Sequence, residues 1–436
     1  MTETNILTKF LEDNDESQHD KAVKGSFISE YYTSANIVEL SFIENLNNVE
    51  SSVKKINCSD QGGLVLIGGS VDWDSQAAKA VPGLENLHRI EFSTTAKRVF
   101  SSSSASHAFF LLSDDTVYSI GFNRPHYSYC LLNSFVTALG KNDFGQLGID
   151  NKETTSTPTK VKLPGKVVKI SAGRSHSLFL LENGDLYGCG NNAFGQLGLG
   201  SAKFQLSPKK ISLENIRDIS CGYDFSVVCD SKGYVYTFGH PENGQLGNGS
   251  TGEYLKDSGS KGPAVQYAYV TTPKRVDLFV SKDAHGKVKS QINYNEIFIR
   301  AVAAGKNHVI CIEEWENSES STSSSSYTPL NRLYSWGFGG YGRLGHNDSK
   351  DEYLPREIAF FSHYPPNSTS PAAQNNRQKQ IREVICGSTF SIAISVSKHF
   401  YFWGKMSNSP RGESAVYPKM QQELYDWPVK TCFHCS

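Results

Sequence analysis

The stretch 191–200, "NNAFGQLGLG", contains the tetrapeptide Gly195-Gln196-Leu197-Gly198, and the recurrence of this tetrapeptide decides the fold. The same four residues occur at 145–148 and 244–247, and residues 342–345 read "GRLG". A catalytic loop is normally needed once, so a loop written four times indicates a repeated architecture. The uninterrupted spacing is 50 residues from Gly145 to Gly195 and 49 residues from Gly195 to Gly244.

Other short motifs recur in register with this tetrapeptide. A strand-like run ending in glycine comes before it, as in "LYGCG" (186–190) and "LYSWG" (333–337), and "FYFWG" (400–404) has no GxLG after it. Upstream lies a further apolar run, as in "SAGRSHSLFLL" (171–181), and downstream a proline opens another strand, as in "PKKI" (208–211). Each unit therefore holds about four short strands separated by turn signals.

Four short strands at this period predict an all-β fold, a β-propeller in which neighbouring blades bury what one blade cannot. We expect the repeated glycines to turn the backbone where a Cβ atom would clash, and each leucine between them to fill the core between blades. One histidine column completes the repeat. The structural repeat positions are Gly145, Leu147, Gly148, Gly195, Leu197, Gly198, Gly244, Leu246, Gly247, Gly342, Leu344, Gly345, His107, His176 and His308.

The domain prediction is a flexible polar N-terminal tail followed by one propeller. The tail covers 1–55 and the propeller 56–436, with insertions at 121–139, 249–298, 313–332 and 362–380. The insertion 121–139 is apolar and aromatic for a surface loop, so it is either a real loop or an unspliced intron. About six blade-like units are expected, and a last blade is expected to be missing, since unpaired strand edges invite aggregation.

Composition excludes several classes of protein. The 436-residue chain has a formal net charge of −1, which argues against strong global attraction to nucleic acid or to an anionic membrane. Its nine scattered cysteines are typical of reduced thiols in an intracellular protein. No apolar stretch approaches the ~20 residues that span a bilayer, so no membrane span is expected.

Over residues 60–436, these columns resemble the regulator of chromosome condensation repeat, whose members form seven-bladed propellers. Four stretches are similar to the branch of the second chromosome-condensation regulator, or telophase disc protein. They are "LVLIGGSVDWD" (64–74), "FGHPENGQLGN" (238–248), "WGFGGYGRLGHNDSKDEYLPR" (336–356) and "FYFWGKMSNSPRGESAVYPK" (400–419). The missing GxLG after Gly404 is shared with that branch, whereas the insertion 121–139 departs from it.

The resemblance implies a non-enzymatic mitotic regulator and protein-interaction platform without a cofactor. Its implied partners are small GTPases of the Rho/Rac type, with a guanine-nucleotide exchange role, and chromatin or microtubule-associated proteins. The chain would be a monomer in nucleus and cytoplasm, at centromeres and the spindle midzone in mitosis. The alternatives are a chromatin-bound exchange factor for the Ran GTPase and, from another class, a propeller lyase or hydrolase.

Several motifs suggest chemistry, and each has a simpler structural interpretation. The repeated histidines stand beside serines, but a nucleophile–base pair would not recur, so we expect each histidine to bond within its blade. "GFGGYG" (337–342) matches a dinucleotide motif formally, yet strand-like sequence follows it. Cys432, His434 and Cys435 are too few for a structural zinc site. The basic run Lys160, Lys162, Lys166 and Lys169 indicates a solvated surface, with phosphate contact as the alternative. No catalytic, cofactor or metal residues are therefore predicted.

The residues that break the repeat are the candidates for partner binding. Arg343 replaces the glutamine of the tetrapeptide, and His346, Asp348, Asp351 and Glu352 follow in a charged loop. An exposed arginine beside acids could anchor a GTPase surface, because arginine is enriched at interface hot spots. The alternative is a set of salt bridges within the blade.

Overall fold

The computed structural model of the chain describes residues 65–69, 84–90, 96–100, 105, 107–121, 142–153, 159–257, 263–283, 285–314, 332–361, 380–405 and 414–421. Within these residues the chain forms β-strands, turns and short 3₁₀ segments without an α-helix, which confirms the all-β class. The predicted tail and most of the insertions at 121–139, 313–332 and 362–380 lie outside the described residues.

Four four-stranded antiparallel sheets, and four antiparallel strands of a six-stranded sheet, form blades one to five, numbered in chain order. Blade one contains β3 (Ala96–Phe100), β4 (His107–Leu112), β5 (Val117–Gly121) and β6 (Thr159–Val161). Blade two contains β7 (Val167–Ala172), β8 (His176–Leu181), β9 (Leu186–Gly190) and β10 (Gln205–Lys210). Blade three contains β11 (Ile216–Cys221), β12 (Phe225–Asp230), β13 (Val235–Gly239) and β16 (Val270–Arg275).

Blade four contains β19 (Ile299–Ala304), β20 (His308–Glu313), β21 (Leu333–Gly337) and β22 (Glu352–Glu357). Blade five contains β23 (Ile381–Cys386), β24 (Phe390–Ser395), β25 (Phe400–Lys405) and β26 (Ser414–Gln421). A further pair, β1 (Val65–Gly69) and β2 (Leu84–Ile90), forms a separate two-stranded sheet. With this pair, the described part of the chain holds six blade-like units, the number that the sequence predicts.

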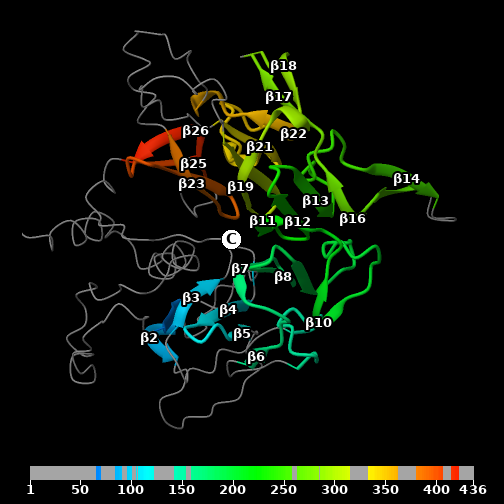
Figure 1. Ribbon diagram of the computed structural model, residues 1–436. Coiled ribbons are helices and arrows are strands. Elements are labelled where there is room, and N and C mark those ends of the chain that lie inside the picture. Colours follow the sequence, from blue (N-terminus) through cyan, green and yellow to red (C-terminus); the bar gives the residue numbers. More distant parts are fainter. Residues whose placement is uncertain are drawn as a thin grey trace, which may run out of the picture.

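The blades are arranged around a central axis, which confirms the propeller (Figure 1). The first strand of each blade lies nearest the axis and the fourth strand lies outermost. Neighbouring first strands pack against each other, as β11 does against β7 and β19, and as β19 does against β23. The second strand of each blade is covered on both sides, so β8 is buried along its whole length, and after His176 and Ser177 it is entirely apolar.

The repeated tetrapeptide is a joint between consecutive blades. In blade two, Gly195 has a φ of +81°, and a Cβ atom there would lie 2.6 Å from the Cα atom of Thr271 in blade three. Gly198 has a φ of +65° and would meet the ring of Phe238, also in blade three, at 3.0 Å. Leu197 between them is fully buried. Both glycines are therefore required by positive φ and by the close approach of the next blade.

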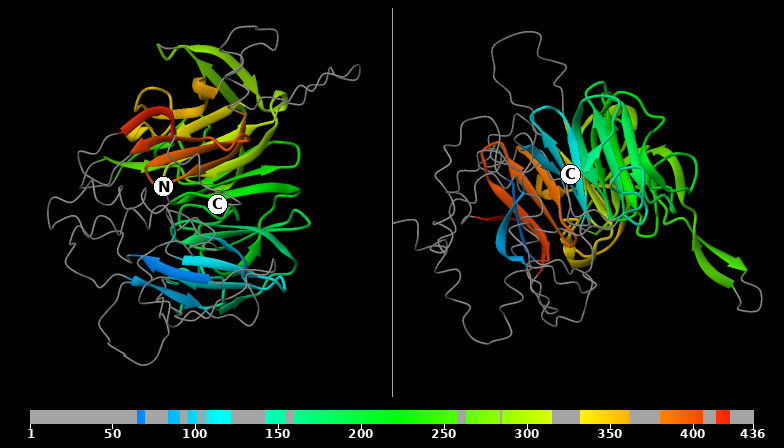
Figure 2. Two further views of the ribbon diagram at one scale, coloured as in Figure 1. Left: turned by 90° about the vertical axis from the view of Figure 1, so that its left-hand side faces the viewer. Right: turned by 90° about the horizontal axis from the view of Figure 1, so that it is seen from below.

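The segment 249–298 contains more than the single insertion predicted for it. Its strand β16 is the fourth strand of blade three, so the prediction of one continuous insertion is wrong. Two hairpins flank this strand. The first pairs β14 (Glu253–Asp257) with β15 (Pro263–Tyr267) and extends away from the blades (Figure 2). The second pairs β17 (Leu278–Lys282) with β18 (Val288–Asn293) and joins blade four, where Val280 is paired with Arg356 of β22.

Candidate partner-binding site

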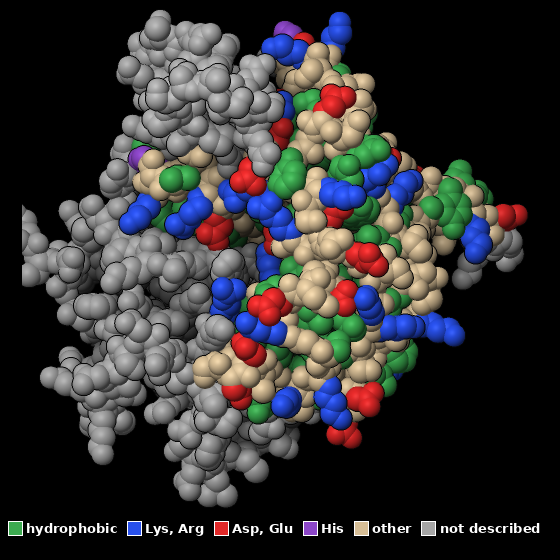
Figure 3. Space-filling model, viewed as in Figure 1, with side chains coloured by type: hydrophobic (Ala, Val, Ile, Leu, Met, Phe, Trp, Pro, Cys, Tyr) green, Lys and Arg blue, Asp and Glu red, His purple; other side chains and the backbone are tan. Residues whose placement is uncertain are grey.

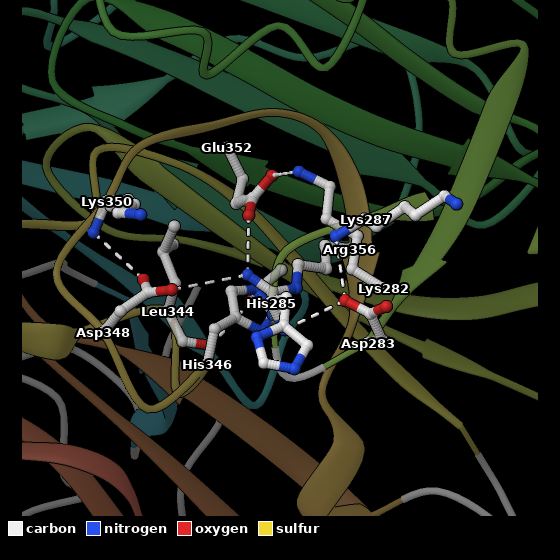
Figure 4. Close-up of polar contacts among 11 residues, drawn as sticks. Lys282, Asp283, His285, Lys287, Leu344, His346, Asp348, Lys350, Glu352 and Arg356 are labelled. Atoms are coloured by element: carbon white, nitrogen blue, oxygen red, sulfur yellow. Dashed lines mark hydrogen bonds and ion pairs between the residues drawn. The ribbon is translucent and has the colours of Figure 1, made fainter. Parts of the chain in front are cut away.

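The predicted charged loop lies where the β17–β18 hairpin joins blade four, and Glu352 is at its centre. Glu352 is only 5 % exposed. Its Oε2 atom accepts a hydrogen bond from Nζ of Lys282 at 2.5 Å, and its Oε1 atom accepts one from Nη1 of Arg356 at 2.7 Å (Figure 4). The same Nη1 atom lies 3.6 Å from Oδ2 of Asp348. The cluster thus ties the hairpin to the blade by charge as well as by strand pairing.

His346 belongs to the same cluster but is not available as a charged anchor. Its Nε2 atom lies 2.9 Å from Oγ of Ser335, and that hydroxyl donates to the carbonyl of Leu344 at 2.7 Å. Burial and then the charge of Arg356 hold the pKa of His346 well below its ordinary value of 6.5. The side chain is therefore neutral at physiological pH and stabilises the turn that carries it.

The two aspartates of the loop bond to the backbone. Oδ1 of Asp351 accepts a hydrogen bond from the backbone N–H of Gly339 at 2.8 Å, and Oδ1 of Asp348 accepts one from that of Lys350 at 3.0 Å. Such bonds hold tight turns by giving the backbone donors a local acceptor. These carboxylates shape the loop, and Asp348 also takes part in the ion cluster.

The expectation that Arg343 is an exposed anchor is wrong, because it is only 3 % exposed. Its Nε atom donates to the carbonyl of Gly340 at 2.9 Å, and Nη1 donates to the carbonyl of Ser388 in blade five at 2.7 Å. The guanidinium carbon lies 4.8 Å from the ring centroid of Phe338 and 5.6 Å from that of Tyr341. Burial lowers the pKa of Arg343 to about 10, so it stays charged. Arg343 joins blade four to blade five, whereas the acids around it pair with other cations.

Sequence reasoning missed the cations and the aromatic residues of this region. Lys282 lies in a segment read as an insertion, so no repeat column pointed to it, whereas Arg356 follows the proline that opens the fourth strand. Tyr341 and Tyr353 are 47 % and 42 % exposed. Tyr341 stands in the aromatic column just before the GxLG phrase, which could have identified it. Nζ of Lys405 lies 5.5 Å from its ring centroid.

The histidine column bonds between blades, so the prediction of bonds within each blade is wrong. The Nε2 atoms of His107, His176 and His308 lie 2.6, 3.0 and 3.0 Å from the Oγ atoms of serines in the next blade. Those serines are Ser177, Ser226 and Ser391, each at the second position of a second strand. Each serine donates to a carbonyl of the preceding blade's GxLG phrase, that of Gln146, Gln196 or Arg343. These hydroxyls are committed to structure, and the histidines do not converge on one pocket.

Blades three and five carry Phe225 and Phe390 where blades one, two and four carry histidine, and the case of Phe225 supports the same pairing. One blade later, the serine position is occupied by Val309. Phe225 and Val309 are both fully buried and belong to one apolar cluster. The joint between two blades is therefore either a histidine with a serine or two apolar side chains.

The remaining motifs do not form a chemical site in the described part of the chain. "GFGGYG" is followed by strand β22 rather than by the helix of a dinucleotide site. Lys166 pairs with Glu182 and Lys169 with Asp218, so two lysines of the basic run are engaged by carboxylates. No group of three metal-ligating side chains occurs among the described residues, and Cys432, His434 and Cys435 lie outside them. No helix in the same residues is long and apolar enough to cross a membrane.

Comparison with known proteins places the repeat in a family. The chain matches the model of the RCC1-like domain over residues 128–431. It is 32 % identical to the RCC2 homolog of Danio rerio over 376 residues, which covers 85 % of this chain and 67 % of that protein. It is 33 % identical to RCC2 of Homo sapiens over 216 residues, which covers 50 % of this chain and 34 % of that protein. The matches thus span between a third and two thirds of these relatives.

Among solved structures, human WBSCR16 aligns with 77 % of this chain and 69 % of its own, at 19 % identity and a TM-score of 0.49.

Proposed function

This chain belongs to the RCC1-like domain family, and we propose that it is a non-enzymatic interaction platform that binds small GTPases of the Rho/Rac type during cell division. The proposal combines the family resemblance of the repeat with one structural feature, the projecting β14–β15 hairpin. The three histidines of the repeated column and their serine partners are used in joints between blades. A binding function needs no catalytic group from them.

The β14–β15 hairpin supports the proposal because it displays apolar side chains in water. Leu255 is 70 % exposed, and its partner across the hairpin, Val265, is 48 % exposed. Tyr254 beside them is 46 % exposed, and hydrophobic side chains gather on this projection (Figure 3). A two-stranded hairpin is at best marginally stable alone, and contiguous exposed apolar residues mark interaction sites. We infer that a partner covers this hairpin.

An exchange role would follow from binding alone. A protein that binds the nucleotide-free GTPase more tightly than the nucleotide-bound form shifts the equilibrium toward nucleotide release. A rigid ring of blades with one projecting hairpin suits this task, because the ring holds the hairpin in place while the hairpin contacts the GTPase. We further propose that the chain acts in nucleus and cytoplasm and reaches centromeres and the spindle midzone in mitosis, which a fluorescent fusion would test.

The decisive experiment is capture of purified GTPases by the immobilised chain. We expect nucleotide-depleted Rho- and Rac-type proteins to bind more tightly than their nucleotide-loaded forms. Leu255→Ser should weaken this binding, whereas Val396→Ser, which alters a 55 % exposed valine in blade five, should not. A nucleotide-release assay then tests exchange. Capture of Ran alone would favour a Ran exchange factor instead, and failure to bind either class would overturn the proposal.

A further inference from the structure

The first strand of every complete blade carries a β-bulge at its second residue. The pairing register shifts between Ala96 and Arg98 in blade one, and at the equivalent place in each later blade. The residues passed over are Lys97, Val168, Arg217, Arg300 and Arg382. A bulge leaves its extra residue unpaired and redirects its side chain. In blades three to five this residue is an arginine, so the bulge places a cation at the same level of the axis three times.

Three of these cations lie on consecutive blades. Arg217, Arg300 and Arg382, here called the axial arginine cluster, come from β11, β19 and β23, the strands nearest the axis. Those strands pack against each other in that order. Lys and Arg side chains gather over the first strands of the blades in the space-filling view (Figure 3). The cluster therefore follows three consecutive blades on one side of the axis.

The central member of the cluster is fixed, and the outer two are exposed. Nη2 of Arg300 donates to the carbonyls of Ile381 and Arg382 at 2.9 and 2.7 Å. Burial lowers the pKa of Arg300, and the charge of Arg217 acts in the same direction. The side chains of Arg217 and Arg382 are 42 % and 46 % exposed. Arg300 therefore holds the strands at a set spacing, and its two neighbours face water.

The exposed arginines have few anionic contacts in the described part of the chain. Nη2 of Arg217 lies 3.4 Å from Oε2 of Glu314, and Nη2 of Arg382 lies 3.7 Å from Oε2 of Glu383. Exposed pairs of this kind contribute little stability. A guanidinium has five N–H donors in a planar fork, so each arginine keeps donors that could bind a carboxylate.

On the first strands of blades one to three, the residue that follows the bulge joins one blade to the next. Lys169 of blade two lies 2.6 Å from Oδ1 of Asp218 in blade three, and Oδ2 of Asp218 accepts the backbone N–H of Val302 in blade four at 2.9 Å. Arg98 of blade one donates to the carbonyl of Val168 at 3.2 Å. These contacts are satisfied between blades, which leaves the exposed arginines of the cluster for a ligand.

We propose that the axial arginine cluster binds an acidic peptide segment of a partner protein, with Arg217 and Arg382 each contacting a carboxylate. The arginine fork matches a carboxylate in two parallel hydrogen bonds. The interleaved Glu314, Glu383 and Asp218 favour a peptide over a nucleic acid, because a continuous phosphate backbone would be repelled by them, whereas a peptide can offer N–H donors. This surface is separate from the β14–β15 hairpin, so the proposal does not depend on GTPase binding.

Fluorescence anisotropy of a labelled glutamate-rich peptide with the full chain tests the proposal. We expect Arg217→Gln and Arg382→Gln each to weaken binding about tenfold, since a hydrogen bond to a charged group is strong, and binding to fall steeply with salt. The matched control is Arg275→Gln, which alters a partly exposed arginine at the end of the outer strand β16 that pairs with Asp277. Unchanged unfolding midpoints would show that the variants fold.

Three outcomes would overturn the proposal. The first is that the peptide does not bind the wild-type chain. The second is that Arg275→Gln weakens binding as much as the two cluster variants, which would indicate general attraction to positive charge. The third is that a single-stranded DNA of equal charge binds the cluster more tightly than the peptide, which would assign the surface to nucleic acid. Retained GTPase capture by the double cluster variant would show that the two surfaces act separately.

Discussion

The Nε2 atom of His176 lies 3.0 Å from Oγ of Ser226 in the next blade, and that hydroxyl donates to the carbonyl of Gln196 at 2.8 Å. Because the serine hydrogen is used on the carbonyl, the histidine must donate from Nε2. Gln196 belongs to the GxLG phrase of the same blade as His176. The phrase, the histidine and the serine of the following blade are therefore one joint, repeated around the ring.

Replacing His176 and Ser226 together by an apolar pair should destabilise the fold less than removing the histidine side chain alone. His176→Ala is expected to destabilise the fold by about 2–4 kcal/mol, because it removes a buried hydrogen bond and leaves a cavity. The double variant with His176→Phe and Ser226→Val reproduces the natural pair of Phe225 and Val309, so it should lose less. Denaturant unfolding measures both. His285→Ala, which alters an exposed histidine on the β17–β18 hairpin, is the control and should change stability little.

A double variant as unstable as the alanine variant would contradict the pairing between histidine and serine columns.

Acid should weaken the same joints. Burial lowers the pKa of His107 and His176 from 6.5 to about 3, and the buried Nδ1 of His176 has no hydrogen-bond partner for a second proton. Below pH 6.5 the unfolded chain therefore binds protons that the folded chain excludes. Stability is fully present above pH 6.5 and is lost as the pH falls toward 3. At pH 5, each buried histidine should lower the free energy of unfolding by about 2 kcal/mol relative to its value above pH 6.5.

Glu383 acts in the opposite direction and must be separated from the histidines. Burial raises the pKa of Glu383 from 4.5 to about 7, so its contribution to stability is present below pH 4.5 and is lost as the pH rises through 7. Unfolding of Glu383→Gln, alone and combined with the His176→Phe and Ser226→Val pair, at pH 7.5 and 5 isolates the two effects. An equal acid-induced loss of stability with and without the Phe–Val pair would refute the role of His176.

Two glycines with matched φ angles allow the cost of the left-handed backbone to be separated from the cost of a steric clash. Gly195 has a φ of +81° and would place a Cβ atom 2.6 Å from Thr271, whereas Gly286 has a φ of +80° and nothing within 4 Å. Gly286→Ala should cost only the left-handed conformation, about 1–2 kcal/mol. Gly195→Ala should cost more, because it also forces blade three away. Equal losses of unfolding free energy in the two variants would show that the tetrapeptide is needed only for its turn.

The spacing of short motifs was enough to predict the blades, because each blade is a local unit of about four strands whose turns have their own sequence signals. The insertion at 249–298 was misjudged because the prediction relied on a constant spacing between motifs. The β14–β15 hairpin separates Gly247 from the fourth strand of its blade, so the constant spacing no longer applied and β16 was included in the insertion. The strand-opening motif "PKRV" at 273–276 predicts this strand, in conflict with the insertion bounds that include it.

The site was harder to predict because its contacts join residues one period apart. Arg343 reads as an unusual and therefore exposed residue, but its partner Ser388 lies 45 residues along the chain, in the next blade. His176 and Ser226 are 50 residues apart. If the blades are taken to follow one another around an axis, each residue of the histidine column can be compared with the serine position of the next blade. The sequence then shows histidine matched with serine, and Phe225 matched with Val309.

Arg343→Gln tests whether this residue is structural. Glutamine stands at the same position in the other three phrases, where its side chain accepts a backbone N–H, as Gln196 does from Phe194 at 2.9 Å. We expect Arg343→Gln to lower the unfolding free energy by about 1 kcal/mol, since two hydrogen bonds to carbonyls are lost and one from a backbone N–H is gained. Arg343→Ala should cost more. GTPase capture should be unchanged in the glutamine variant, and its loss would restore Arg343 as a partner-binding residue.

The ion cluster makes a prediction about the β17–β18 hairpin that does not depend on any partner. Glu352→Gln removes a buried charge shared by Lys282 and Arg356, which leaves Lys282 without its carboxylate and Arg356 with only the longer contact to Asp348, at a cost of about 3 kcal/mol. Because Lys282 lies on β17, the loss should loosen the hairpin before the blade unfolds, so trypsin should cleave faster after the exposed Lys287. Lys166→Met, which breaks the exposed pair with Glu182, is the control and should leave cleavage unchanged. Cleavage at the wild-type rate in Glu352→Gln would mean that the strand pairing of Val280 with Arg356 holds the hairpin without the charges.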